Sequence, residues 1–77
     1  MARIAKFDEG RLTRLSLHDP IDATYYAYEF DGRKLLQINT SGRSSREMPD
    51  KVSQSIQLDE ASARSLYEIL KRHFGFG

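Results

Sequence analysis

The end of the chain carries an apolar stripe with the spacing of an amphipathic helix. After Asp59, apolar side chains recur every three or four residues, at Ala63, Leu66, Ile69, Leu70 and Phe74. Asp59 is a favourable N-cap and Gly75 a natural stop, so the pattern predicts a helix from Asp59 to Phe74, with Leu66 fully buried. A helix of roughly four turns is unstable alone in water. Its stripe must therefore pack on another element, and the remaining sequence offers only a sheet.

Alternation of apolar and polar residues predicts the strands of that sheet. The run from Val52 to Leu58 alternates with period two and leads directly into the helix. The run from Leu12 to His18 has the same period, and Arg3 to Phe7 is a further candidate strand that would pair with it. Together with a central hairpin, these runs predict an α+β fold. We expect a small antiparallel β-meander of four or five strands, with one face covered by the helix and the other open.

Asp31-Gly32 predicts the hairpin, because this pair supplies the positive φ angles that tight turns need. It separates two runs rich in aromatic and branched residues, Ala23 to Phe30 and Arg33 to Thr40. Two registers are open. A two-residue turn pairs Phe30 with Arg33, whereas a three-residue turn with Gly32 in the left-handed conformation pairs Glu29 with Arg33.

The two registers differ in the residues that share a face. The two-residue turn groups Tyr25 and Ala27 with Leu36 and Ile38, and it leaves on the other face Tyr26, Tyr28, Phe30 and Leu35. The three-residue turn gathers on one face Thr24, Tyr26, Tyr28, Lys34, Leu36 and Ile38. We favour the three-residue turn, because it keeps the bulkiest apolar side chains together.

Length and composition restrict the class of protein. With 77 residues and no cysteine, residues 1–77 form a single domain without a disulfide. A core this small supplies only about 3–5 kcal/mol, so we expect a homodimer that buries further surface. The formal net charge of +1 argues against attachment to nucleic acid by phosphate neutralisation alone. The sequence has no run of roughly 20 apolar residues and no secretory signal, so we expect a cytoplasmic protein that does not bind membranes.

The sequence contains no recognisable catalytic or metal-binding motif. His18 and His73 are the only histidines, and a site would require them to converge with carboxylates. His73 falls in the last turn of the predicted helix, where a cation stabilises the helix dipole. No serine has His and Asp partners at a motif spacing, and no phosphate-binding or dinucleotide-binding glycine pattern occurs. We expect a protein that is not an enzyme and that uses no metal or cofactor.

Half of the aromatic residues fall on one predicted strand, at Tyr25, Tyr26, Tyr28 and Phe30. Aromatic strands flanked by arginine and lysine can stack unpaired bases. We favour packing in the core, because a small sheet needs large side chains against its helix.

Basic residues near one end of the hairpin and in the loop from Ser41 to Asp50 are candidate binding residues for phosphate or an acidic protein surface: Arg33, Lys34, Arg43, Arg46 and Lys51. Carboxylates lie among them and weaken their field. The open face of the sheet is expected to carry a polar lattice of Arg14, Ser16, His18, Gln37, Asn39, Ser53, Ser55 and Gln57. Such a face suits solvent, a second protein or a symmetric copy.

Phe74 and Phe76 are candidate interface residues at the end of the chain. Phe76 follows the predicted helix stop at Gly75, and we expect it to pack across a two-fold interface or into the sheet edge. The alternative is that Phe76 covers the core of its own chain.

The run from Ser55 to Leu70 reads Ser-Ile-Gln-Leu-Asp-Glu-Ala-Ser-Ala-Arg-Ser-Leu before its last four residues. It resembles the endings of many short uncharacterised bacterial and phage proteins, in which a strand reading Ile-x-Leu leads into a C-terminal helix. The resemblance implies the strand-to-helix corner and no site residue.

The expected function is a small non-enzymatic protein-interaction module, of the adaptor or inhibitor kind that phages and mobile elements often encode. It would work as a homodimer or on a larger protein. The alternative is single-stranded nucleic-acid binding through the tyrosine-rich hairpin and the basic loop. A third possibility is an accessory subunit of an enzyme.

Overall fold

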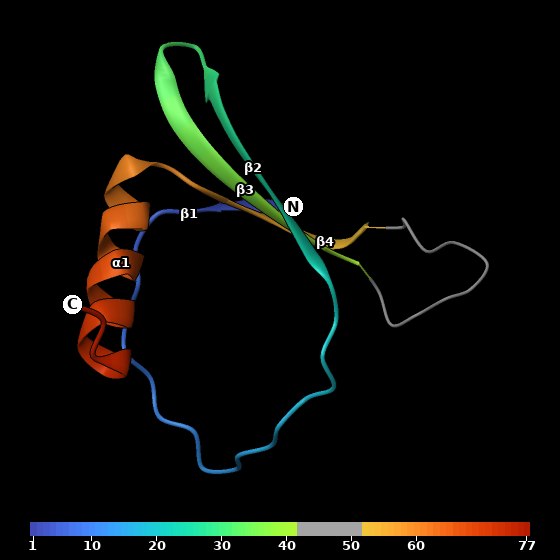
Figure 1. The fold of residues 1–77 in the computed structure, drawn as a ribbon, viewed down its shortest axis with the longest axis vertical. Coiled ribbons are helices and arrows are strands. Elements are labelled where there is room, and N and C mark those ends of the chain that lie inside the picture. Colours follow the sequence, from blue (N-terminus) through green and yellow to red (C-terminus); the bar gives the residue numbers. More distant parts are fainter. Residues whose placement is uncertain (42–51) are drawn as a thin grey trace.

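The computed structural model describes residues 1–41 and 52–77, which form a four-stranded sheet and one C-terminal helix (Figure 1). The elements are β1 (Ala2–Ile4), β2 (Ala23–Phe30), β3 (Arg33–Ser41), β4 (Val52–Leu58) and α1 (Glu60–Phe74). The strand order is β1-β4-β3-β2. The predicted α+β class is confirmed, with a mixed sheet, because β1 runs parallel to β4 while the other neighbours are antiparallel.

The N-terminal part of the sheet differs from the prediction. β1 is shorter than the predicted strand from Arg3 to Phe7 and pairs with β4, where Ala2 lies opposite Ile56. The predicted strand from Leu12 to His18 is wrong, because these residues are irregular and exposed. They belong to an arc, residues 5–22, that joins the β1 edge of the sheet to the β2 edge (Figure 1). Period-two alternation indicates on which face of a sheet each side chain would lie, but a strand also needs a neighbouring strand to pair with.

The hairpin of β2 and β3 has the two-residue turn. Phe30 pairs with Arg33, and the turn residues Asp31 and Gly32 have φ angles of 53° and 77°. The favoured three-residue register is therefore wrong. Two consecutive left-handed residues match the right-handed twist of the flanking strands, and aspartate tolerates this conformation well. The conformation of the turn therefore determines the hairpin register, and the grouping of bulky apolar side chains does not.

Both ends of α1 are fixed by the residues that the sequence indicates. The Asp59 carboxylate accepts the backbone N–H of Ser62 at 3.0 Å, and the Ser62 hydroxyl accepts the backbone N–H of Asp59 at 3.0 Å. This reciprocal pair is a capping box. At the other end Gly75 has a φ of 75° and donates its N–H to the carbonyl of Lys71 at 2.9 Å. The predicted helix is confirmed.

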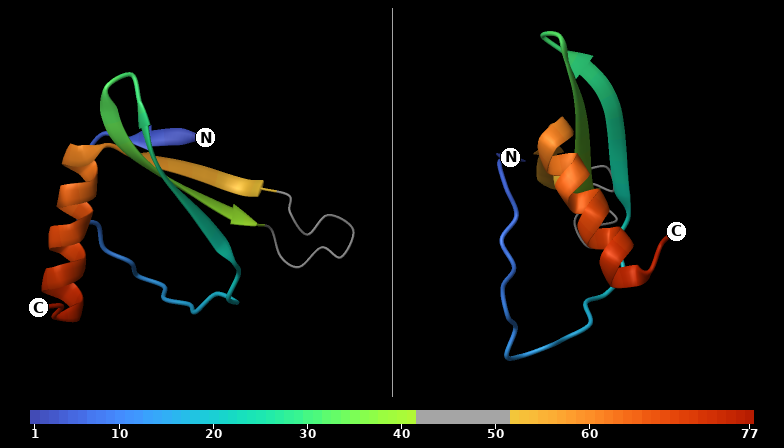
Figure 2. Two further views of the ribbon diagram at one scale, coloured as in Figure 1. Left: turned by 45° about the horizontal axis from the view of Figure 1, so that its top comes forward. Right: turned by 90° about the vertical axis from the view of Figure 1, so that its left-hand side faces the viewer.

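The core is small and lies where β4 turns into α1. Among the described residues, Leu58 is the buried hydrophobic side chain, with 2% of its surface exposed. Leu66 is half-buried and not fully buried as predicted. The reason is the direction of α1, which packs on β3 and β4 and then leaves the sheet at an angle (Figure 2). Its later turns therefore have little sheet beneath them.

Candidate functional site

The helix presents an apolar seam that is half-buried at its start and exposed along the rest of its length. The helix seam consists of Ala63, Tyr67, Leu70 and Phe74, whose 4-3-4 spacing is that of the inward positions of a coiled coil. Tyr67 is 53% exposed, Leu70 37% and Phe74 62%. The buried Ser62 and the half-buried Leu66 and Ile69 lie on a neighbouring side of α1. Ala63 and Tyr67 instead line the space between α1 and the strands β3 and β4. The apolar arc of α1 is thus wider than the part that the sheet buries.

A groove lies between the start of α1 and the strands β3 and β4. It has a volume of about 570 Å³. Apolar groups of Leu36, Leu58, Ala63 and Tyr67 line it. Its charged lining residues are Lys34, Asp59, Glu60 and Arg64. A pocket of this size with an apolar lining and a mixed-charge rim can receive apolar side chains of a partner.

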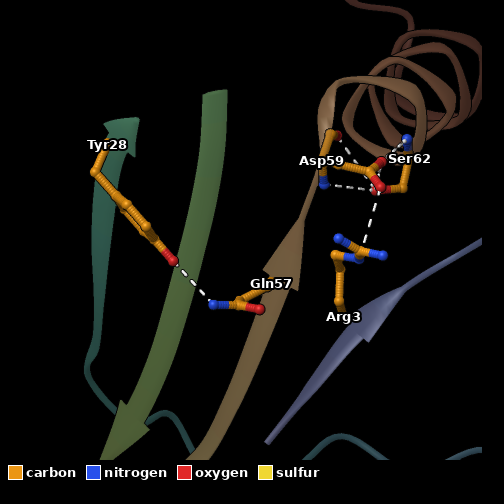
Figure 3. Close-up of polar contacts among 5 residues, drawn as sticks. All are labelled: Arg3, Tyr28, Gln57, Asp59 and Ser62. Atoms are coloured by element: carbon orange, nitrogen blue, oxygen red, sulfur yellow. Dashed lines mark hydrogen bonds and ion pairs between the residues drawn. The ribbon is translucent and has the colours of Figure 1, made fainter. Parts of the chain in front are cut away.

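The Asp59 carboxylate at this rim is held in its ionised form. The backbone N–H of Ser62 and then the Ser62 hydroxyl, 3.0 Å away, hold the pKa of Asp59 below its ordinary value of 3.8. The guanidinium of Arg3, with Nε 3.8 Å from Oδ2, lowers the pKa further (Figure 3). The rim therefore carries a fixed negative charge at neutral pH.

An aromatic tail lies at the opposite end of α1. The aromatic tail consists of Phe74 and Phe76, whose rings stack with centroids 5.5 Å apart and planes 13° apart. His73 contacts Phe74 edge to face at 4.8 Å. Both phenylalanines are exposed, so Phe76 is not part of a buried core. The two candidate interface residues are thus brought together, on a surface that their own chain leaves open.

The sheet face opposite α1 carries a network of hydrogen bonds between β2, β3 and β4. Gln57 Nε2 donates to Tyr28 Oη at 2.9 Å (Figure 3). It also donates to Gln37 Oε1 at 3.3 Å, and Tyr28 Oη donates to the same oxygen at 3.2 Å. Asn39 Oδ1 accepts from Gln37 Nε2 at 2.9 Å and from Ser55 Oγ at 2.8 Å. No buried side-chain nitrogen or oxygen in the described part of the chain lacks a partner. The network satisfies itself and stiffens the sheet.

The polar lattice predicted for this face is confirmed in part. Gln37, Asn39, Ser55 and Gln57 do share it, as the strand register requires. Arg14, Ser16 and His18 do not belong to it, because the strand predicted to carry them is absent. Tyr28 joins the network from β2, which the favoured hairpin register did not allow.

The candidate basic residues do not form one cluster where the structure describes them. Arg33 and Lys34 are neighbours on β3 and so lie on opposite faces of the sheet. Lys34 lines the groove, and Arg33 lines a hollow of the open face together with Arg3 and Phe30. The candidates Arg43, Arg46 and Lys51, with most of the predicted loop, lie outside the described residues.

The aromatic residues of β2 are more exposed than expected. Tyr28 is half-buried, but Tyr25, Tyr26 and Phe30 are exposed. Packing against the helix is therefore wrong for all four aromatic residues. Tyr26, Tyr28 and Phe30 lie on the sheet face opposite α1. Tyr25 lies on the same face as α1, but α1 packs on β3 and β4 and does not extend over the edge strand. Sequence reasoning also missed Tyr67, which completes the helix seam. Its 4-3-4 spacing with Ala63, Leu70 and Phe74 was the signal that could have identified it.

In residues 1–41 and 52–77, no three side chains of histidine, cysteine, aspartate or glutamate gather as a metal site would require. Over the same ranges, no helix is long and apolar enough to cross a membrane. Comparison with protein-family models, with curated proteins and with solved structures finds no match. Function must therefore be inferred from the groove, the helix seam, the aromatic tail and the polar network.

Proposed function

We propose that this chain is a small non-enzymatic protein-interaction module that binds its partner with the groove and the helix seam. It acts in the cytoplasm as an adaptor or inhibitor of the kind that phages and mobile elements encode. The polar network is internally satisfied and serves to hold the sheet rigid behind the binding surface.

The observation that carries this proposal is the amount of surface left open. The accessible surface is 7477 Å², whereas a compact monomer of 8.9 kDa exposes about 4800 Å². The radius of gyration is 14.8 Å, compared with about 11.5 Å for a compact domain of this length. Part of the excess comes from the irregular arc of residues 5–22, and part comes from exposed apolar side chains, among them three members of the helix seam. Exposed apolar side chains aligned along one helix, as in the seam, are typical of a site that another protein covers.

Photocrosslinking tests this function at one residue. Tyr67 is replaced by the photoreactive amino acid p-benzoylphenylalanine in cells that express the protein, and the crosslinked species are identified by mass spectrometry. A matched control carries the same group at Ser65, which is exposed on the opposite side of α1. We expect protein adducts from position 67 and few from position 65. Equal labelling from both positions, or none, would contradict the proposal.

A second candidate is single-stranded nucleic-acid binding, which the open face of the sheet favours. Tyr26 and Phe30 are exposed there on one face, and Phe30 lines the same hollow as Arg3 and Arg33. Bases stack on such aromatic rings while arginines contact phosphate. Titration with a labelled oligonucleotide at two salt concentrations tests it, because binding driven by phosphate contacts weakens steeply with salt. Phe30→Ala should reduce any genuine affinity.

A further inference from the structure

The partner of the groove can be identified more closely, on the basis of the function proposed above. We propose that it is a second copy of this chain. In this homodimer the two α1 helices run antiparallel about a two-fold axis near Tyr67. The aromatic tail of each copy, Phe74 and Phe76, covers the groove of the other.

The positions of groove and tail along α1 support this arrangement. The groove is lined by residues of the first turns, from Glu60 to Tyr67, and the tail follows the last turn. With 15 residues, α1 is about 22 Å long. When two such helices pair antiparallel, the end of one lies beside the start of the other. Each copy then supplies a tail and receives one, and the contact closes as a two-fold dimer.

The helix seam provides the contact between these two ends. Its 4-3-4 spacing keeps Ala63, Tyr67, Leu70 and Phe74 on one line along the helix. Such a line packs along its whole length against a second helix with the same spacing. A single copy leaves Tyr67, Leu70 and Phe74 exposed, and the dimer would bury the first two at its centre.

The charges of α1 favour antiparallel pairing. Glu60 stands in the first turn, and Lys71, Arg72 and His73 stand in the last. An antiparallel partner brings the acidic start of one helix, with the ionised Asp59, to the basic end of the other. The two helix dipoles are then also opposed. With a formal net charge of +1, the copies repel each other little.

The chain leaves more surface exposed than a compact monomer does, and the seam and the tail contribute to it. A standard protein interface takes about 800 Å² from each partner, and obligate homodimers take more. The accessible surface of 7477 Å² exceeds that of a compact monomer of this mass by about 2700 Å². Only part of this excess lies along α1, because the arc of residues 5–22 is exposed as well. The dimer would bury the exposed apolar side chains at the seam and the tail, which are Tyr67, Leu70, Phe74 and Phe76.

The first experiment measures the oligomeric state of the full chain by size-exclusion chromatography with light scattering over a range of concentrations. We expect the wild-type protein to be a dimer. Leu70→Glu places a charge in the seam and should convert it to a folded monomer, whereas Ser65→Glu, on the opposite side of α1, should leave the dimer intact. Circular dichroism confirms that each variant is folded. Removal of Phe76 and Gly77 should raise the dimer dissociation constant at least about tenfold, because the tail no longer covers the groove.

The second experiment tests the antiparallel geometry. Glu60→Lys alone places like charges together at both symmetry-related contacts between the start of one helix and the end of the other. Lys71→Glu alone does the same. Each substitution should raise the dimer dissociation constant by about tenfold or more. In a one-to-one mixture of the two variants, both contacts become complementary, and the heterodimer should form with near wild-type affinity. If the wild-type protein is a dimer but mixing restores nothing, the antiparallel α1 pairing is wrong, and the dimer uses another surface such as the β2 edge.

The same measurements separate this inference from the proposed function. A wild-type protein that stays monomeric at every concentration overturns the second copy as partner. If the benzophenone at position 67 then labels a different protein, the chain is still an interaction module. If that group labels no protein, the proposed function fails as well.

Discussion

The strongest test of the fold concerns Leu58, which we expect to contribute more to stability than any residue of α1. Truncation of a buried leucine to alanine costs about 2–5 kcal/mol, of which one part is lost transfer free energy and the other is the cavity left behind. Leu58 is 2% exposed, so the full transfer free energy of its side chain is lost. The cavity costs less, because the adjoining groove lets neighbouring side chains and water move into it. We therefore expect Leu58→Ala to cost about 2–3 kcal/mol. Truncation of the half-buried Leu66 to alanine should lower the free energy of unfolding by about 1 kcal/mol.

Urea unfolding followed by far-ultraviolet circular dichroism measures both changes. A domain of this size has only about 3–5 kcal/mol of stability, so Leu58→Ala should remove about half of it or more and lower the melting temperature by about 10–20 °C. Protein concentration must be the same for all variants, because self-association adds to the apparent stability. The reasoning would be refuted if Leu66→Ala cost as much as Leu58→Ala, since the core would then lie under the middle of α1.

Four further substitutions test the turn, the cap and the polar network. Gly32→Ala should cost about 1–2 kcal/mol in thermal unfolding, because Gly32 has a φ of 77°, while Asp31→Asn should be nearly neutral. The pKa of Asp59 is lowered in the folded state, so its stabilising effect is present above the ordinary value of 3.8 and is lost as the pH falls through the lowered pKa. Asp59→Asn should be less stable than the wild-type protein at pH 7 and lose less stability on acidification, and an unchanged pH profile would exclude this carboxylate as the cause. Gln57→Ala should cost about 1 kcal/mol in urea unfolding, because Tyr28 loses a donor, and a neutral result would show that water replaces the amide.

Local signals in the sequence predicted the elements whose ends are fixed by nearby residues. Asp59 and Gly75 marked both ends of α1, and Asp31-Gly32 marked the hairpin turn. Each of these depends on hydrogen bonds or φ angles within a few residues, so the sequence contains the whole cause. The strand Val52–Leu58 was predicted for the same reason, since its alternation is local.

The features that the sequence did not predict depend on distant segments. Pairing of Ala2 with Ile56 joins opposite ends of the chain, and no local pattern specifies it. The alternation from Leu12 to His18 predicted a strand that finds no neighbour. The exposure of Tyr67 follows from the angle at which α1 leaves the sheet, and periodicity along a helix does not contain that angle. Because of this angle, Leu70 and Phe74 of the helix seam are exposed, although in the sequence they belong to an apolar stripe that predicts a buried face.

The parallel pairing of β1 with β4 has a consequence for the order of folding. Ala2 lies opposite Ile56, so β1 is synthesised seconds before its partner at a rate of about 5–20 residues per second. The hairpin of β2 and β3 needs only its turn to close, whereas β1 must close a loop that spans most of the chain. The sheet should therefore assemble from the hairpin through β4 and take up β1 last. Because β1 is also a short edge strand, its amides should be the first in the sheet to exchange with solvent deuterium.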